Sequence, residues 1–140
     1  MKIKYEGTTP YKKYDYDAGY DLLLNEDIVL SPGRVVTTEL DFSIEIPKGY
    51  MGILLPRGGS AKRGILVQTP PIDHGYTGKI HAIIFYAGVL PMELHKGDRV
   101  CQLVIIPIML PQLVEETSDF FRGDNRFNST GTRGGIDELQ

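Results

Sequence analysis

The chain has 140 residues, the size of one ordinary domain and enough to bury a hydrophobic core without disulfides or metals. Its net charge of −3 argues against a non-specific nucleic-acid binder, and its 41% hydrophobic content is that of a globular protein. A single cysteine excludes an internal disulfide and the usual zinc sites, and no apolar run is long enough to span a membrane. The N-terminus does not resemble a signal peptide, so we expect a soluble, cytoplasmic protein in a reducing compartment.

Short β-rich segments separated by glycine, proline, asparagine and aspartate dominate the sequence, and helical periodicity is almost absent. Turns are expected at residues 31–33 and 47–49, and an exposed loop at residues 11–17. In chain order, the expected strands are residues 2–5, 19–24, 27–30, 35–38, 41–46, 50–55, 80–85 and 100–108. Many short strands of this kind predict an all-β sandwich.

The later segments differ in pattern. Residues 41–46 alternate strictly between polar and apolar, which predicts a half-buried strand. Residues 100–108 are apolar on both faces apart from Gln102, which predicts a strand inside the sandwich or against another subunit. From Pro111 the sequence is polar and glycine-rich, with too little apolar surface to fold alone. We therefore predict a β domain over residues 1–112 and, over residues 113–140, a flexible C-terminal arm that either frays or orders over a ligand or a neighbouring subunit.

One stretch, residues 69–79, places a single carboxylate, Asp73, between two prolines and a glycine-rich turn. Pro70 and Pro71 restrict the backbone on the approach, and Tyr76 follows three residues after the acid. This pattern predicts a hairpin whose tip holds an acid and an aromatic ring in a fixed relation. An acid on a stiff turn is a candidate general base, but on this stretch alone the more common role of capping a turn stays open.

Four other segments carry groups suited to a phosphorylated ligand. An acid follows a glycine near residue 21, an arginine precedes small residues whose backbone N–H groups suit an anion, a lone glutamine interrupts an apolar strand, and the tail combines a cation with an aromatic ring. The side chains concerned are Asp21, Arg57, Gln102, Arg122 and Phe127. Together with Asp73 and Tyr76 they offer donors for phosphates, an acid for a water molecule, and rings for a base and a sugar.

In this order the segments resemble the five motifs of the homotrimeric dUTPase family, the dUTP nucleotidohydrolases. Each motif alone is a weak signal, but five in order at compatible spacing are a strong one, and they favour a catalytic role for Asp73. The matching segments are Ala18-Gly-Tyr-Asp-Leu22, Pro56-Arg57 with the residues that follow, Ile72-Asp-x-x-Tyr-x-Gly78, Gly97-Asp-Arg-Val-x-Gln-Leu103 and Arg122-Gly-x-x-x-Phe-x-Ser-Thr-Gly131. The resemblance implies a distorted jelly-roll β-sandwich or barrel that forms a homotrimer, with active sites between subunits.

The resemblance also implies an activity, the hydrolysis of dUTP to dUMP and pyrophosphate by in-line attack of water on the α-phosphorus. Asp73 would orient and activate that water and contact the 3′-hydroxyl. Tyr76 would pack against the deoxyribose, where a 2′-hydroxyl would clash. Uracil would be read by backbone groups at Pro71, Ile72 and His81, in a slot too narrow for a 5-methyl group.

On the phosphate side, the resemblance implies contacts from the second, fourth and fifth motifs. Arg57, Gly58, Gly59 and Gln102 would bind phosphates. From the arm, Arg122 would reach the terminal phosphates and Phe127 would stack on uracil as the site closes. Mg²⁺ would bind phosphate oxygens and waters, with Asp21 reaching it only through water, and would neutralise charge and fix the phosphate chain. No nucleic-acid or membrane partner is implied.

Two motifs depart from the family pattern. The second normally reads Arg-Ser-Ser or Arg-Ser-Gly, whereas Gly58 here lacks the hydroxyl, and losing one such donor costs about 2–4 kcal/mol in the transition state. In the fifth, Asn125 and Arg126 stand where glycines are usual, and Asn128 follows Phe127. These departures predict catalysis below the family norm and leave a second hypothesis, a dUTPase-like nucleotide-binding protein that regulates a protein partner.

A third hypothesis is the sister enzyme dCTP deaminase, which shares the fold. Its third motif has a tryptophan followed by a catalytic glutamate, and this chain has Tyr76 and Ile83 at those places. Structural roles are expected for four other residues: His74 in an exposed turn, His95 in a loop, Arg99 paired near Asp98 or across an interface, and Cys101 as a small core residue without a basic partner.

Overall fold

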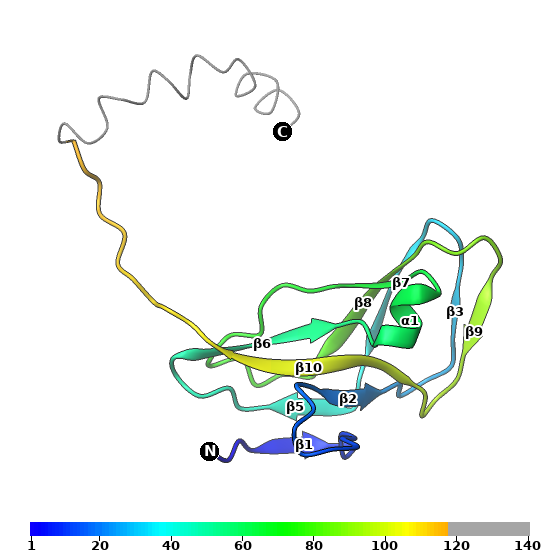
Figure 1. The fold of residues 1–140 in the computed structure, drawn as a ribbon, viewed down its shortest axis with the longest axis horizontal. Coiled ribbons are helices and arrows are strands. Elements are labelled where there is room, and N and C mark those ends of the chain that lie inside the picture. Colours follow the sequence, from blue (N-terminus) through cyan, green and yellow to red (C-terminus); the bar gives the residue numbers. More distant parts are fainter. Residues whose placement is uncertain (118–140) are drawn as a thin grey trace. The chain divides into compact units, whose positions relative to one another are not determined.

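The computed structural model describes residues 1–117, and its first compact unit spans Met1–Met109 (Figure 1). Within the described residues there are ten strands and one short helix. In chain order they are β1 (Tyr5–Gly7), β2 (Tyr20–Leu23), β3 (Ile28–Leu30), β4 (Val35–Glu39), β5 (Phe42–Ile44), β6 (Tyr50–Leu55), α1 (Gly58–Lys62), β7 (Ile65–Gln68), β8 (His81–Tyr86), β9 (Met92–Leu94) and β10 (Arg99–Pro107). The second unit begins at Leu110, and its described part, residues 110–117, is exposed and contains no helix or strand.

The strands pair antiparallel in four small sheets, ordered β2-β10-β6, β4-β8-β7, β1-β5 and β3-β9. The two three-stranded sheets contribute to one hydrophobic core, because Leu22, Leu54 and Leu103 of the first sheet join the same cluster as Ala82 and Ile84 of the second. The all-β jelly-roll sandwich predicted from the sequence is therefore confirmed.

Most predicted strands are present with small shifts at their ends. The alternating segment becomes β5, whose Phe42 and Ile44 are buried, and Ile46 just beyond it is buried too. The expected first strand at residues 2–5 is corrected to Tyr5–Gly7, because pairing with β5, from Tyr5 opposite Ile44 to Gly7 opposite Phe42, sets where β1 lies. Three elements were not predicted. The helix α1 begins with two glycines, which are poor helix formers, and β7 and β9 are short strands placed by pairing with β8 and β3.

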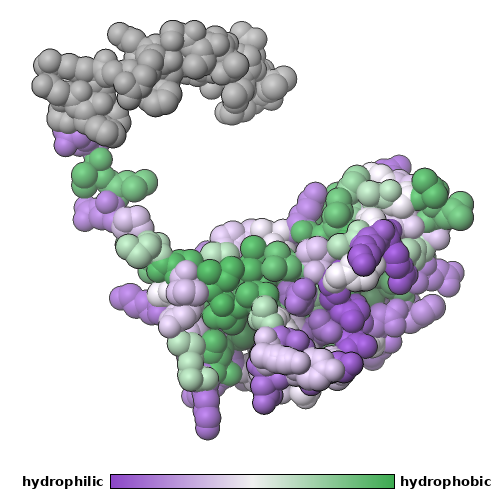
Figure 2. Space-filling model, in the orientation of Figure 1, coloured by the Kyte–Doolittle hydropathy of each residue, from purple (hydrophilic) through white to green (hydrophobic). Residues whose placement is uncertain are grey.

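The strand expected to be apolar on both faces is β10, and its two halves differ. Val100, Cys101 and Leu103 are buried in the core, whereas Val104 and Ile105 are half-buried and Ile106 is 36% exposed. Figure 2 shows hydrophobic residues gathered over β6 and β10 on this face of the molecule. The sandwich interior thus accounts for the first half of β10, and the second half leaves apolar surface uncovered within one chain. Among residues 1–117, no helix is long and apolar enough to cross a membrane.

Candidate functional site

The predicted hairpin around Asp73 exists, as the connection between β7 and β8. The two strands pair antiparallel from Ile65 opposite Tyr86 to Gln68 opposite Ile83. The connecting residues 69–80 turn back after the acid, where the Tyr76 N–H donates to the Asp73 carbonyl oxygen at 3.2 Å. Gly75 inside this turn has φ 98°, a conformation that other residues rarely adopt. The tip is therefore a long shaped loop and not a two-residue turn.

The loop is fastened to the sandwich on both sides of Asp73. Ile72 exchanges two backbone hydrogen bonds with Gly52 of β6, at 2.8 and 2.9 Å. A Cβ at position 52 would lie 3.3 Å from the Ile72 Cβ, so the absence of a side chain there permits the close approach. On the far side, His74 Nδ1 donates to the Ile46 carbonyl oxygen at 2.8 Å. Asp73 consequently sits between two anchored neighbours, as a rigid catalytic side chain requires.

A cavity of about 260 Å³ opens beside this loop, and we call it the hairpin pocket. Its lining is Leu54, Thr69, Pro70, Pro71, Ile72, Asp73, Tyr76, Ile80, His81 and Ile83. The pocket thus collects the five residues of the described chain that the resemblance assigned to sugar, base and water, Pro71, Ile72, Asp73, Tyr76 and His81. Asp73 is exposed, and its carboxylate has no hydrogen bond or ion pair to the residues that the structure describes.

The Tyr76 ring is held over the end of the loop. Its hydroxyl donates to the Lys79 carbonyl oxygen at 2.7 Å, and 44% of the residue stays exposed. The ring lies so close to Gly78 that a Cβ there would be 2.8 Å from the hydroxyl oxygen. The absence of a side chain at Gly78 therefore leaves the space that the Tyr76 ring occupies. Tyr76 in turn lines the hairpin pocket.

A second cavity, of about 510 Å³, is called the arginine pocket here. Its lining is Tyr11, Lys12, Lys13, Asp17, Ala18, Gly19, Asp21, Arg57, Arg99 and Gln102. Strand register explains why residues distant in sequence meet there: on β10, Gln102 lies opposite Asp21 of β2 on one side and Leu55 of β6 on the other. The chain leaves β6 through Pro56 to Arg57. The predicted phosphate-side residues Asp21, Arg57 and Gln102 are thus brought together.

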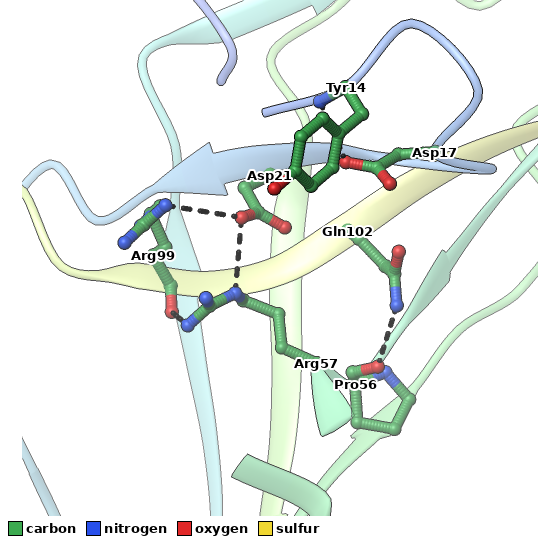
Figure 3. A network of polar contacts seen from close by, with 7 residues as sticks. All are labelled: Tyr14, Asp17, Asp21, Pro56, Arg57, Arg99 and Gln102. Atoms are coloured by element: carbon green, nitrogen blue, oxygen red, sulfur yellow. Dashed lines mark hydrogen bonds and ion pairs between the residues drawn. The ribbon is translucent and has the colours of Figure 1, made fainter. Parts of the chain in front are cut away.

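Figure 3 shows the Asp21 carboxylate between two guanidinium groups. Its Oδ2 lies 3.2 Å from Arg57 Nε and 3.7 Å from Arg99 Nη1. The Arg99 guanidinium also lies 4.5 Å from the centroid of the Tyr11 ring. Of the two alternatives predicted for Arg99, pairing near Asp98 is wrong within the described residues: Asp98 Oδ2 accepts from the His95 N–H, and Arg99 pairs with Asp21. Pairing across an interface stays a prediction.

Gln102 lines the arginine pocket, and the glycines of the second motif follow Arg57 directly in the chain. Gln102 Nε2 donates to the Pro56 carbonyl oxygen at 3.1 Å, and its Oε1 lies against Gly19, where a Cβ would be 2.5 Å away. Arg57 is the N-cap of α1, so Gly58 and Gly59 open the helix and their N–H groups have no partner within it. A Cβ at Gly58 or Gly59 would meet nothing within 4 Å. The backbone there is both open and rich in donors.

Other predicted roles have clear outcomes. Cys101 is fully buried, and burial raises the pKa of its thiol to about 12, so its expected role as a core residue and not a nucleophile is confirmed. His74 is exposed in the turn and His95 lies in the loop after β9, as expected. The motif-five residues Arg122 and Phe127, with Asn125, Arg126 and Asn128, lie outside the described residues.

The two pockets share no lining residue. Sequence reasoning did not single out Lys12, Lys13 or Arg99 as members of the arginine pocket. The sequence did offer a signal for each: Arg99 lies inside the fourth motif, and Lys12 and Lys13 precede the first motif, which begins at Ala18.

Comparison with known proteins identifies the family. The dUTPase family model matches residues 5–131. The deoxyuridine 5′-triphosphate nucleotidohydrolase of fowlpox virus is 33% identical over 138 residues, covering 94% of this chain and 95% of the relative. Among solved structures, EIAV dUTPase aligns with TM-score 0.73 at 30% identity, covering 84% of this chain and 99% of that one. A mutant dUTPase of phage phi11 of S. aureus aligns with TM-score 0.79 at 24% identity, covering 86% and 100%. On the extent of the family match and the identity to the viral relative, this chain belongs to the dUTPase family.

Proposed function

We propose that this protein hydrolyses dUTP to dUMP and pyrophosphate, as a dUTP diphosphatase. The observation that carries the proposal is Asp73, an unpaired carboxylate on an anchored loop, beside an aromatic ring and inside a pocket of about 260 Å³. The viral relative is named a deoxyuridine 5′-triphosphate nucleotidohydrolase, and family membership supports the same substrate.

The hairpin pocket is the proposed site for deoxyuridine. The Tyr76 ring packs on the deoxyribose and leaves no space for a 2′-hydroxyl, so ribonucleotides are refused. Backbone groups of Pro71, Ile72 and His81 bind the edge of uracil. Pro71 and Ile72 can contribute only carbonyl oxygens, because proline has no N–H and the Ile72 N–H donates to Gly52. Asp73 accepts a proton from water, the water oxygen bonds to the α-phosphorus, and the bond from that phosphorus to the bridging oxygen breaks, releasing pyrophosphate.

The arginine pocket is the proposed site for the phosphate chain. Arg57 supplies charge, the first N–H groups of α1 at Gly58 and Gly59 donate to phosphate oxygens, and Gln102 adds an amide. The arm is proposed to close over the bound nucleotide, with Arg122 at the terminal phosphates and Phe127 on uracil. We keep the domain boundary predicted from the sequence for this proposal: a β domain at residues 1–112 and an arm at residues 113–140.

Homotrimer formation would unite the two pockets. The two pockets have separate linings within one chain. A nucleotide that occupies both would therefore bind where the hairpin pocket of one subunit adjoins the arginine pocket of another. The apolar surface over β6 and β10 supplies area for such an interface (Figure 2).

Subunit complementation tests this assembly. Co-assembled Asp73→Asn and Arg57→Ala chains should recover about a quarter of wild-type activity, because a random mixture leaves that fraction of intersubunit sites intact. A chain carrying both substitutions is the control and should stay inactive. A monomer by light scattering, or no recovery on mixing, would contradict the proposed assembly.

Magnesium is proposed as the metal, held mainly by the substrate. Within residues 1–117 no group of three or more His, Cys, Asp or Glu side chains is placed to bind a metal, and Asp21 is already neutralised by Arg57 and Arg99. This donor set fits an ion bound by phosphate oxygens and water, with Asp21 in its outer sphere. When bound, Mg²⁺ neutralises the phosphate charge. The related phage phi11 dUTPase mutant coordinates a structural Mg(II) ion.

A reducing compartment such as the cytoplasm is also proposed, because the one cysteine of the chain, Cys101, is buried and free.

Product analysis separates the competing functions. The purified protein is incubated with Mg²⁺ and dUTP, dCTP or UTP, and pyrophosphate and ammonia are measured. Pyrophosphate from dUTP alone supports the proposal, whereas ammonia from dCTP supports a deaminase. Binding of dUTP without turnover supports a nucleotide-binding regulator, the reading that the missing hydroxyl at Gly58 favours.

Asp73→Asn is the decisive variant. The amide keeps the shape of the side chain but cannot accept the proton, so turnover should fall by about 10²–10⁴-fold while the Kd of a non-hydrolysable dUTP analogue stays within a few-fold. Glu45→Gln, which makes the same charge change at an exposed acid outside the hairpin pocket, is the control. Full activity in Asp73→Asn would remove Asp73 as the base.

A further inference from the structure

Residues 12–20 form a closed loop at the rim of the arginine pocket. Its base is tied by two backbone hydrogen bonds between Tyr11 and Asp21, at 2.9 and 2.7 Å. Inside the loop, Asp17 Oδ2 accepts from the Tyr14 N–H at 3.0 Å, as Figure 3 shows, and the Asp17 N–H donates to the Tyr14 carbonyl oxygen at the same distance. Hydrogen bonds therefore fix the backbone of the loop both at its two ends and in its middle, although its side chains are mostly exposed.

This loop brings two lysines into the lining of the arginine pocket. Lys12 Nζ lies 4.2 Å from the centroid of the Tyr20 ring, and Lys13 Nζ lies 5.2 Å from that of Tyr14. Both contacts are cation–π interactions, which limit the conformations of two otherwise flexible side chains. Neither ring lines the arginine pocket, so the two lysines belong to its rim, and these contacts hold their ammonium groups without neutralising them.

The charges that line the arginine pocket do not cancel. Four cations, Lys12, Lys13, Arg57 and Arg99, line it together with two carboxylates, those of Asp17 and Asp21. Asp21 is shared by the two arginines, and Asp17 is engaged by the Tyr14 N–H. No ion pair joins either lysine to a carboxylate among residues 1–117. The positive charge left for a ligand is therefore concentrated on the lysines.

We propose that Lys12 and Lys13 form a subsite for the terminal phosphates of a nucleoside triphosphate and select the substrate by phosphate number. This inference rests on the proposed function, because it assumes that the phosphate chain of dUTP binds in the arginine pocket. The second motif of this chain offers only backbone donors at Gly58 and Gly59, and the arginines are partly neutralised by Asp21. Two unpaired ammonium groups supply the point charges that bind phosphate oxygens.

The subsite predicts that the lysines add affinity only to ligands with a phosphate chain. Calorimetry is performed with α,β-imido-dUTP, dUMP and inorganic tripolyphosphate, at low and high salt, on Lys12→Met/Lys13→Met. Loss of two charge-assisted contacts should raise the Kd of the imido analogue and of tripolyphosphate by roughly 10- to 100-fold and flatten their salt dependence. The Kd of dUMP should change less than two-fold.

Lys2→Met/Lys48→Met is the matched control, because it removes the same charge from exposed lysines outside the arginine pocket. Its ligand affinities should equal those of the wild type. If the double variant of the loop does not fold, Lys13→Met alone, at an exposed position, carries the test. Equal losses for dUMP and the triphosphate analogue, or equal affinities in the loop and control variants, would overturn the inference.

Failure of the subsite and failure of the proposed function give different results. If the wild type leaves dUTP intact but tripolyphosphate binding still depends on Lys12 and Lys13, the proposed activity fails and the polyphosphate subsite stands. If dUTP is hydrolysed with the same KM in wild type and loop variant, the activity stands and the subsite is refuted.

Discussion

At the scale of single residues, two glycines of the candidate site differ in the space around them. Gly58 at the start of α1 is open, since a Cβ there would meet nothing within 4 Å. Gly78 is filled by the Tyr76 ring, whose hydroxyl would lie 2.8 Å from an added Cβ. A substitution at Gly58 therefore tests whether an added hydroxyl improves phosphate binding. A substitution at Gly78 tests whether the position of the Tyr76 ring matters for the choice of sugar.

Gly58→Ser should raise turnover by about 30-fold or more if the absent hydroxyl limits phosphate stabilisation, because one such donor is worth about 2–4 kcal/mol in the transition state. Gly58 does not have a positive φ, so the new side chain brings no backbone strain. Gly58→Ala is the control, since it shares any gain in helix stability but adds no donor. Equal kinetics for the serine and alanine variants would mean that Ser60 or the backbone already fills this role.

Gly78→Ala should weaken the discrimination between dUTP and UTP. The added methyl group displaces the Tyr76 hydroxyl from its hydrogen bond with the Lys79 carbonyl, and the ring then leaves its position beside the sugar. The ratio of kcat/KM for dUTP to that for UTP is measured. Tyr76→Phe is the comparison, because it removes the hydrogen bond to the Lys79 carbonyl but leaves the space beside Gly78 for the ring. An unchanged ratio in Gly78→Ala would show that the ring position does not decide sugar choice.

At the scale of elements, the loop between β7 and β8, which carries the proposed base, is held by contacts from strands distant in sequence. Besides the bonds to Gly52 and Ile46, the Ile80 N–H donates to the Phe42 carbonyl oxygen at 2.8 Å. At the same end, Lys79 Nζ lies 2.6 Å from Asp41 Oδ1, and Asp41 Oδ2 accepts from Thr8. These contacts tie the end of the loop to the start of β5.

The Asp41–Lys79 pair predicts a defined pH window. Hydrogen bonds from Lys79 and then Thr8 hold the pKa of Asp41 below 3.8, and the bond to Asp41 raises the pKa of Lys79 above 10.5. Stabilisation by Asp41 is present above pH 3.8 and lost as pH falls through its folded pKa, while that by Lys79 is present below pH 10.5 and lost as pH rises through its folded pKa.

Lys79→Met should return the Asp41 pKa toward 3.8, which carboxyl-carbon NMR titration measures. The acid-unfolding midpoint should move to higher pH by a small amount, because the pair is exposed to solvent and screened by salt. Lys48→Met serves as the control with the same charge change. An Asp41 titration that is identical in the wild type and Lys79→Met would refute the pairing.

At the scale of the whole molecule, the hydrophobic core and the proposed catalytic arm belong to different parts of the chain. All of the buried core residues lie between Leu22 and Leu103, inside the first compact unit. The motif that is proposed to close the site begins at Arg122. Stability and catalysis should therefore respond separately to changes in the tail.

Truncation before Arg122 should lower kcat by about 10²-fold or more while changing Tm by less than a few degrees, because the removed residues are proposed to bind phosphate and close the site, and the core of the described residues ends at Leu103. Removal of residues 132–140 alone, beyond the fifth motif, is the control and should leave kcat near wild type. Unchanged kinetics in the longer truncation would show that the arm has no part in turnover.

The sequence by itself determined the fold class, the order of the five motifs and the acid on a proline-flanked loop, because alternation, glycine and proline act locally. It did not reveal α1, which begins with two glycines, or β7 and β9, which are placed by pairing with β8 and β3, nor the pairing of Arg99 with Asp21. Only the tertiary structure decided that Asp21 faces Gln102 across β2 and β10, that Gly52 fastens Ile72 beside the acid, and that the candidate site is divided between two pockets. Those features depend on strand register, which long-range contacts establish and local sequence does not encode.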